Sequence, residues 1–317
     1  MSRYPFPSVP NGWFAVAGSA DLAIGDVRPL SYLDRELVAY RGEDGCARVL
    51  DAHCPHLGAH LGVGGTVCGT GITCPFHAWR FDGDGRLAEV PDLDVPPRVA
   101  ARSWQVRETN GRVFVWHHAD SAEPSYEIPA YRDDPAEWTP WRTSSYTVRV
   151  HVQDLTENII DRAHFPAVHD MTPPDDKHFE VRFDGPSMVV DQNVKVTAVA
   201  ESGFEVTTRT TTCGPGIVAV EVTQHGLEML TYITQTPVDD ERTEICIAFS
   251  MKALQDAEAT EAIARMNDEV TNLQFTQDIP IWENKVYRER PIVTKVDGPI
   301  TQYRRWFRQF YGDTFVG

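Results

Sequence analysis

Two short segments of the sequence each place one cysteine and one histidine close together. The first reads Cys54-Pro-His56, and after seventeen further residues the second reads Cys74-Pro-Phe-His77. Thiolates and imidazoles are ligands that iron and zinc both accept in proteins. The stretch between the segments is rich in glycine, which lets the backbone turn sharply enough for two loops to face each other. The four side chains therefore predict a metal centre.

Two metal centres suit this ligand set. In a [2Fe–2S] cluster the cysteines would bind one iron and the histidines the other. In a structural zinc site all four side chains would bind a single ion. Zinc sites more often pair cysteine with cysteine along the chain, whereas each loop here is mixed, so the iron cluster is favoured. Four unrelated residues would not account for the repeated Cys-Pro. A red-brown colour would distinguish the cluster from zinc.

A second group of candidate ligands lies in the segment ENIIDRAHFPAVH. A continuous helix would place four side chains on one narrow face, at steps of three and four residues: Asp154, Glu157, Asp161 and His164. Taken alone, this pattern is typical of a surface helix with a solvated acidic face. Pro166 lies between His164 and His169, and we expect it to break the helix so that both imidazoles turn toward one point. Two histidines and a carboxylate form the facial triad of non-haem Fe(II) oxygenases.

The elements around these residues fall into two domains. Residues 12–117 are short β-prone runs with glycine-rich turns, which predicts a small all-β domain. Residues 118–140 are polar and rich in proline, as in a linker. A strand, a helix, about six further strands and a long helix over 256–290 follow. The chain is therefore expected to be α+β, with domains at 1–122 and 123–317.

Composition excludes several classes of protein. The formal net charge of −17 would repel nucleic acid. We find no apolar run of about eighteen residues that would span a membrane and no apolar signal-peptide stretch, so a cytoplasmic location is expected. Six cysteines are too few for a disulfide scaffold in a chain of 317 residues. The four cysteines outside the two loops are expected to be buried small side chains: Cys46, Cys68, Cys213 and Cys246.

The two Cys-His loops resemble those of the Rieske iron–sulfur family. In the respiratory branch of that family each loop carries a further cysteine, and the two form a disulfide. Ala59 and Phe76 hold those places here, as in the oxygenase and ferredoxin branch. The second segment resembles the Asp-x-x-His-x-x-x-x-His pattern of Rieske oxygenases at Asp161, His164 and His169.

This resemblance implies two metal centres. Cys54, His56, Cys74 and His77 would hold a [2Fe–2S] cluster, and His164 and His169 would bind mononuclear Fe(II) with a carboxylate from the C-terminal helix. The candidates for that carboxylate are in QFTQDIPIWENK. Asp278 is the first choice, because Pro280 would interrupt the helix beside the metal, and Glu283 is the second.

The resemblance also gives Asp161 a separate role. The aspartate at this position does not bind the iron in the family. It connects the mononuclear site by hydrogen bonds to a cluster histidine, here His77 or His56, of a neighbouring subunit. Glu157 and Asn158 are weaker candidates for residues just outside the metal ligands.

The C-terminal run through RRWFRQFYG resembles the oxygenase component of bacterial 3-ketosteroid 9α-hydroxylases and the related cholesterol 7-desaturases. The resemblance implies a second domain of the helix-grip fold, a homotrimer, and a reductase that supplies electrons from NADH or NADPH directly or through a ferredoxin. The expected reaction is hydroxylation of an apolar polycyclic, steroid-like substrate with O₂.

Two alternatives remain open at this point. The same metal centres would serve hydroxylation, desaturation or demethylation of an aromatic or natural-product intermediate. A protein of another class, an electron carrier or a carrier of hydrophobic ligands, would need the two histidines and the downstream carboxylate to be coincidental.

Overall fold

The computed structural model describes residues 3–172, 177–196, 204–224 and 226–312. The chain divides into two compact units, which we describe separately. The N-terminal unit runs from Trp13 to His117. The C-terminal unit contains the residues up to Gly12 together with the chain from His118 onward. We expected residues 3–12 to belong to the first domain, but they pack within the C-terminal unit.

The N-terminal unit consists of small antiparallel sheets. One sheet holds β1 (Gly12–Gly18), β10 (Arg112–His117) and β9 (Val106–Thr109), in that order, and a second holds β2 (Val27–Tyr32), β3 (Arg35–Arg41) and β4 (Ala47–Asp51). A third sheet holds β5 (Thr66–Cys68), β6 (Gly71–Thr73), β7 (Arg80–Phe81) and β8 (Leu87–Glu89). The middles of β3 and β10 are continuous apolar runs that are buried on both faces, which makes the all-β core.

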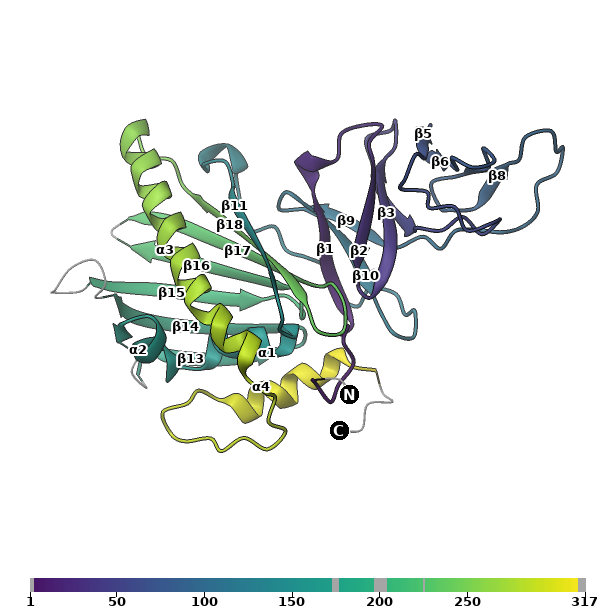
Figure 1. Cartoon of the computed structure of the whole chain (residues 1–317). Helices are drawn as coiled ribbons and strands as arrows, with labels where there is room; N and C mark the ends of the chain where they lie inside the picture. The colour runs from purple at the N-terminus through teal and green to yellow at the C-terminus, as the bar shows by residue number, and fades with distance from the viewer. Residues whose placement is uncertain (1–2, 173–176, 197–203, 225, 313–317) are drawn as a thin grey trace. The chain divides into compact units, whose positions relative to one another are not determined.

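The C-terminal unit is built on one large antiparallel sheet (Figure 1). As far as it is described, the sheet has eight strands, seven of them in the order β11-β18-β17-β16-β15-β14-β12, with β13 also paired to β14. The strands are β11 (Arg142–Val148), β12 (Met171–Thr172), β13 (Phe179–Asp184), β14 (Ser187–Val196), β15 (Phe204–Thr212), β16 (Ile217–Gln224), β17 (Leu227–Pro237) and β18 (Thr243–Met251).

The long helix α3 (Ala257–Asn284) lies across one face of this sheet (Figure 1). Asp256 caps its start by accepting hydrogen bonds from the N–H groups of Glu258 and Ala259. Apolar residues at alternate positions of β18, such as Ile245 and Ile247, pack against the helix at Trp282. The α+β class, with a sheet gripped by a long helix, is therefore confirmed.

Short helices complete the C-terminal unit: α1 (Val152–Glu157), α2 (His164–Val168) and α4 (Ile300–Phe307). The helix α4 packs with the N-terminal segment in one apolar cluster that includes Tyr4, Phe6, Tyr303 and Phe307. None of the helices among the described residues has both the length and the apolar character needed to cross a membrane.

The cysteines outside the two loops only partly follow the sequence expectation. Cys213 and Cys246 are buried, as expected, but Cys46 and Cys68 are exposed. The prediction was wrong for this pair because Cys46 precedes β4 at a turn and Cys68 ends the short strand β5 at a turn, where a small side chain faces solvent.

Candidate metal centres

The two Cys-His loops have the same backbone hydrogen bonds. The Cys54 N–H donates to the Ala59 carbonyl at 2.9 Å, and the Cys54 carbonyl accepts from the Gly58 N–H at 2.9 Å. The second loop repeats these bonds at the positions five and four residues after Cys74, at 2.8 and 3.1 Å. Each loop is thus a closed turn that presents its cysteine and histidine from a fixed backbone.

The cysteines of these loops are buried, whereas the histidines are exposed to solvent. Cys54 and Cys74 are only 2% and 3% exposed. Burial raises the pKa of the Cys54 thiol, and the neighbouring Cys74 thiol adds to the effect. His56 and His77 are exposed, with ring centroids 4.7 Å apart. An inner pair of thiols and an outer pair of imidazoles is what a two-iron cluster with mixed ligands requires.

A single zinc ion suits this arrangement less well. A tetrahedral ion would gather all four ligand atoms within about 4 Å of one another. Among the described residues, the group whose ligand atoms are close enough to hold one metal ion lies elsewhere in the chain and includes none of these four. The geometry therefore favours the two-iron cluster.

Aromatic side chains fix the two imidazoles. The His56 ring stacks on Trp79, with centroids 4.2 Å apart and planes inclined by 4°, and Phe76 lies 3.8 Å from the His77 ring. Trp79 also packs against the apolar core of the N-terminal unit. Leu57 and Phe76, next to the histidines, are 65% and 61% exposed, so apolar surface borders the outer side of this centre.

The helix expected between Asp154 and His164 is broken. The helix α1 ends at Glu157, one 3₁₀ turn covers Asn158–Ile160, and Asp161 has extended backbone before α2 begins at His164. The solvated acidic face, which the spacing taken alone would indicate, is not formed, because Asp154 and Glu157 are buried. Asp154 is 1% exposed and binds Lys285, at 3.0 Å. Glu157 accepts two hydrogen bonds from Arg304, at 2.5 and 2.8 Å.

Neither proline acts as the sequence suggested. Pro166 lies in the first turn of α2, where its missing N–H has no partner to lose. The break before His164 and the end of α2 at Val168, with His169 as the C-cap, orient the two rings instead. Pro280 does not end α3, which continues to Asn284. Both predictions treated proline as a helix breaker, but α2 and α3 each continue past their proline.

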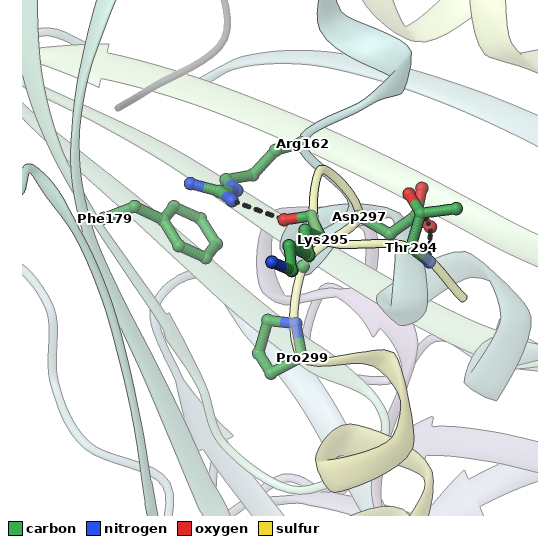
Figure 2. Close-up of a pocket in the computed structure, with 7 residues that line it drawn as sticks. Arg162, Phe179, Thr294, Lys295, Asp297 and Pro299 are labelled. Carbon is green, nitrogen blue, oxygen red and sulfur yellow. Dashed lines mark hydrogen bonds between the residues drawn. The ribbon is translucent and has the colours of Figure 1, made fainter. Parts of the chain in front are cut away.

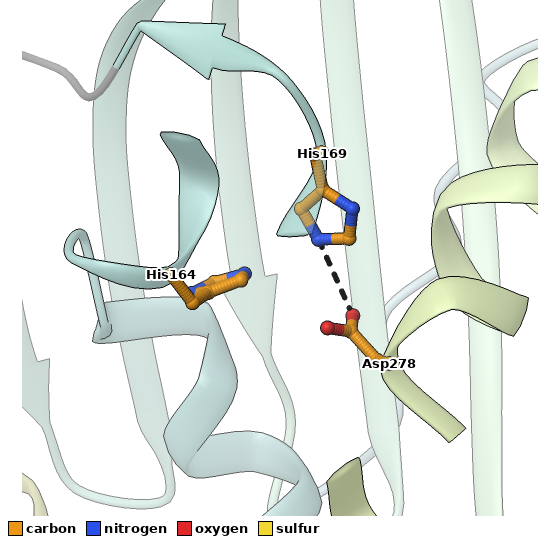
Figure 3. A group of neighbouring side chains, drawn as sticks. All are labelled: His164, His169 and Asp278. Carbon is orange, nitrogen blue, oxygen red and sulfur yellow. Dashed lines mark ion pairs between the residues drawn. The ribbon is translucent and has the colours of Figure 1, made fainter. Parts of the chain in front are cut away.

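The structure brings His164, His169 and Asp278 together (Figure 3). Their ligand atoms all lie within 4.8 Å of one another, and His169 Nε2 is 3.4 Å from Asp278 Oδ2. Asp278 faces the sheet because it lies on the same side of α3 as the buried Trp282, one turn further on. Glu283, the second choice, is not part of this group.

Hydrogen bonds hold each imidazole by its other nitrogen. His164 Nδ1 donates to the Asp161 carbonyl at 2.7 Å, and His169 Nδ1 donates to Gln277 Oε1 at 3.0 Å. Both Nε2 atoms are thereby directed to the space beside Asp278. This is the usual way in which a protein fixes the tautomer of a metal-binding histidine. Gln277 was not predicted from the sequence, where its position next to Asp278 was the only signal.

Asn158 also belongs to this site. Its Nδ2 donates to Asp278 Oδ2 at 3.2 Å and lies 3.3 Å from His164 Nε2. The 3₁₀ turn after α1 places it there. Of the two weaker sequence candidates, Asn158 contacts the ligands, whereas Glu157 is turned to Arg304.

The pKa values of the two histidines are shifted in opposite directions. Burial lowers the pKa of His164, which keeps its imidazole neutral and able to bind a metal. Burial opposes protonation of His169 as well, but the hydrogen bonds to Asp278 and Gln277 outweigh it and raise the pKa. A bound cation would favour the neutral, metal-binding form of both imidazoles.

Asp161 contacts His164 mainly through its backbone. Its Oδ1 accepts a hydrogen bond from the Ala163 N–H at 3.0 Å, and its Oδ2 is 3.9 Å from His164 Nδ1. The carboxylate is one-third exposed. The predicted connection of Asp161 to a cluster histidine stays a prediction.

A pocket of about 260 Å³ lies next to Asp161, at Arg162 (Figure 2). Its lining residues are Arg162, Phe179, Thr294, Lys295, Asp297, Gly298 and Pro299. Arg162 donates to the Lys295 carbonyl at 3.4 Å. None of the three clustered ligands lines it, so we do not assign substrate to this pocket.

Comparison with known proteins places both regions in families. Residues 12–105 match the Rieske [2Fe-2S] domain, and residues 115–311 match the 3-ketosteroid 9α-hydroxylase C-terminal domain. The chain belongs to the Rieske non-haem iron oxygenases. This oxygenase is 33% identical to a cholesterol 7-desaturase of Bombyx mori, over 98% of this chain and 71% of that protein. It is 32% identical to a probable 3-ketosteroid-9-alpha-monooxygenase, oxygenase component, of Rhodococcus rhodochrous, over 95% and 80%.

Solved structures share the fold of this oxygenase. The NdmA protein of Pseudomonas putida CBB5 with caffeine aligns with a TM-score of 0.76 at 20% identity, over 93% of this chain and 89% of that one. Dicamba monooxygenase bound to dicamba aligns with a TM-score of 0.71 at 21% identity, over 95% and 97%. Because the family match includes the C-terminal domain, the expectation of an enzyme is confirmed, and the carrier alternative no longer accounts for the chain.

Proposed function

We propose that this chain is the terminal oxygenase of a multicomponent system and hydroxylates an apolar polycyclic, steroid-like substrate. Electrons from NADH or NADPH would arrive through a reductase, directly or with a ferredoxin between. The observation that carries the proposal is the cluster of His164, His169 and Asp278 inside a domain that matches the 3-ketosteroid 9α-hydroxylase family. The steroid class is supported by the names of relatives about 30% identical over nearly the whole chain.

The residues present fit the two metal centres that this function needs, a mononuclear iron and a [2Fe–2S] cluster. Two Nε2 atoms and one carboxylate oxygen make the facial ligand set that non-haem Fe(II) accepts. When bound, the iron would supply O₂ activation, and the [2Fe–2S] cluster would supply single electrons. The protein fixes the ligand geometry: Asp161 and Gln277 hold the histidines, and Asn158 holds the Asp278 carboxylate.

Asp161 is the proposed connection between the two centres. Its carbonyl holds the ligand His164, and its carboxylate is partly exposed, so it is available to a histidine from outside the C-terminal unit. The exposed His56 and His77, bordered by the apolar Leu57 and Phe76, form a surface suited to a second copy of the chain. We therefore place electron transfer between neighbouring subunits of a homotrimer.

Iron analysis of two variants tests the mononuclear site. Asp278→Ala should lose one of the roughly three iron atoms expected per chain and all product, yet keep the visible absorbance of the cluster. Glu283→Ala, five residues further along the same helix, should retain both. Full iron content in Asp278→Ala would overturn the assignment.

A substrate panel tests the substrate class. The purified oxygenase with a matching reductase and NADH is given steroids, terpenoids and aromatic compounds, and O₂-dependent products are identified by mass spectrometry. Product from steroids supports the proposal. Product from aromatic compounds alone would establish the alternative of the same chemistry on a different substrate.

A further inference from the structure

Two polar side chains of the C-terminal sheet have buried oxygen atoms that find no hydrogen-bond partner among the described residues: Gln192 Oε1 and Thr208 Oγ1. Gln192 lies on β14 and Thr208 on β15, and the strand register makes them direct cross-strand partners. Residues that are directly opposed on neighbouring strands point to the same face of the sheet, with Cβ atoms about 5 Å apart. The two oxygens therefore belong to one small polar spot.

This polar spot lies on the face of the sheet that is turned toward the metal ligands. Thr208 is opposite Val222 of β16. Val222 and Phe165 both pack against the buried pair Met171 and Val206. Phe165 in turn stacks on the ligand His164, with ring centroids 4.6 Å apart. A series of apolar side chains, Val222, Val206, Met171 and Phe165, thus connects the spot to the mononuclear site.

Unpaired buried oxygens of this kind indicate a site where a ligand binds. Buried polar groups in folded proteins nearly always have a partner, because an unmade hydrogen bond is costly in an apolar environment. Here the two side chains do not pair with each other, although they are neighbours. The glutamine oxygen only accepts hydrogen bonds, whereas the threonine hydroxyl also donates one. One group satisfies both at once: a hydroxyl that donates to Gln192 and accepts from Thr208.

We propose that Gln192 and Thr208 bind a hydroxyl group of the substrate. The proposal rests on the proposed function and narrows its substrate class to apolar polycyclic alcohols. The rest of the molecule would lie along apolar side chains such as Val206 and Val222, with the carbon to be oxidised at the site of His164.

Binding of three related steroids tests this assignment. The probes are a steroid alcohol with its hydroxyl at C3, the matching C3 ketone and the matching hydrocarbon, titrated into the full-length oxygenase by tryptophan fluorescence. The wild type should bind the alcohol about tenfold more tightly than the hydrocarbon, the equivalent of one good hydrogen bond. Thr208→Val and Gln192→Leu should lose this preference. Thr207→Val, whose side chain is exposed on the opposite face, should keep it.

The melting temperature without ligand separates recognition from a structural role. If the Thr208 hydroxyl is unpaired in the free protein, Thr208→Val should melt at the same temperature as the wild type or higher. A lower melting temperature would assign the hydroxyl to structure and overturn the proposal. A ketone bound as tightly as the alcohol would also overturn it.

The substrate panel separates the two levels of inference. Steroid turnover with an unchanged preference for the alcohol in both variants overturns the role of Gln192 and Thr208 alone. Absence of product from every steroid with the wild type overturns the proposed function, and this inference with it.

Discussion

The two histidines of the mononuclear site depend on acceptors of different kinds. His164 is held by a backbone carbonyl, which no substitution at Asp161 removes directly. His169 is held by the side chain of Gln277, which is exposed on α3. Because the partner on Nδ1 sets both the ring orientation and the basicity of Nε2, the site is most easily weakened at Gln277.

Replacement of Gln277 should therefore weaken metal binding without touching a ligand. In Gln277→Leu the dissociation constant for Fe(II) should rise about tenfold or more, because His169 loses the acceptor that fixes its tautomer. Titration of Fe(II) into metal-free protein measures this directly. Gln277→Glu keeps an oxygen at the same place and should bind Fe(II) at least as well as the wild type. Unchanged affinity in Gln277→Leu would show that packing alone orients His169.

His151 is a buried histidine with a structural function. It caps α1: its Nδ1 accepts a hydrogen bond from the Gln153 N–H at 3.0 Å, and its Nε2 donates to the Pro7 carbonyl at 3.0 Å. Burial lowers its pKa from 6.5 to about 4. The neutral ring is required, since a protonated Nδ1 could not accept from the helix.

This pKa predicts a loss of stability in acid. Between pH 6.5 and 4 the unfolded chain binds a proton at His151 that the folded chain does not, so the free energy of unfolding falls as pH falls, by up to about 3 kcal/mol from this group. His151→Asn keeps a capping oxygen but does not titrate. Urea unfolding at pH 7, 5.5 and 4.5 should show a shallower decline in the variant. Parallel declines in both proteins would contradict the assignment.

At the scale of elements, the backbone position of the segment 158–163 depends on a distant loop that contains Gly298. A Cβ atom on Gly298 would lie 1.5 Å from the Ile160 carbonyl oxygen. The next residue, Asp161, supplies the carbonyl that holds His164. The close approach of Gly298 therefore sets the position of the backbone on which one metal ligand rests.

Gly298→Ala should accordingly displace that backbone. We expect a loss of about 1–3 kcal/mol in the free energy of unfolding from overpacking, together with weaker Fe(II) binding. Gly226→Ala is the control: apart from its chain neighbours, no described residue has an atom within 4 Å of its Cβ position, and its φ of +80° costs only backbone strain of about 1 kcal/mol. Denaturant unfolding and Fe(II) titration compare the two. Wild-type Fe(II) affinity in Gly298→Ala would show that the Asp161 carbonyl does not depend on this contact.

The sequence predicted those features that depend only on residues close together in the chain. Cys54 and His56 lie on one turn, so their spacing alone indicated a metal loop, and the alternation of apolar residues along β18 indicated a sheet strand. Asp278, more than a hundred residues from His169, was found only through resemblance.

The sequence did not predict features that depend on tertiary contacts. The spacing from Asp154 to His164 predicted one continuous helix, but α1 ends at Glu157 and the chain is extended at Asp161. The contact with Gly298 at Ile160 comes from a distant loop. The pairing of Gln192 with Thr208 depends on strand register, which periodicity does not specify. Such residues become visible only once the strands are placed.

At the scale of the whole molecule, the N-terminal unit is an insertion into the C-terminal one. The chain begins in the C-terminal unit, leaves it after Gly12 and returns at His118. The first residues are firmly held there. Arg3 donates to the carbonyls of Arg149 and Trp282, both at 2.5 Å, and Asn11 donates to the Phe310 carbonyl at 2.6 Å. The two units are therefore joined by two covalent connections, and residues 3–12 stabilise the C-terminal unit, although the N-terminal unit follows them in sequence.

Phe6 should reveal this arrangement in unfolding experiments. Its ring stacks on Tyr311 with centroids 5.4 Å apart and meets Tyr287 edge-on at 4.9 Å. Phe6→Ala should cost about 3–5 kcal/mol, because a large aromatic side chain is lost from a packed cluster. Calorimetry should show a lower transition temperature for the C-terminal unit, while the temperature at which the cluster absorbance bleaches stays constant.

The control is Phe76→Ala, because the Phe76 side chain is 61% exposed on the N-terminal unit and its loss should change neither temperature by much. An earlier bleaching of the cluster in Phe6→Ala, with no change in the other transition, would mean that the first twelve residues stabilise the cluster domain instead.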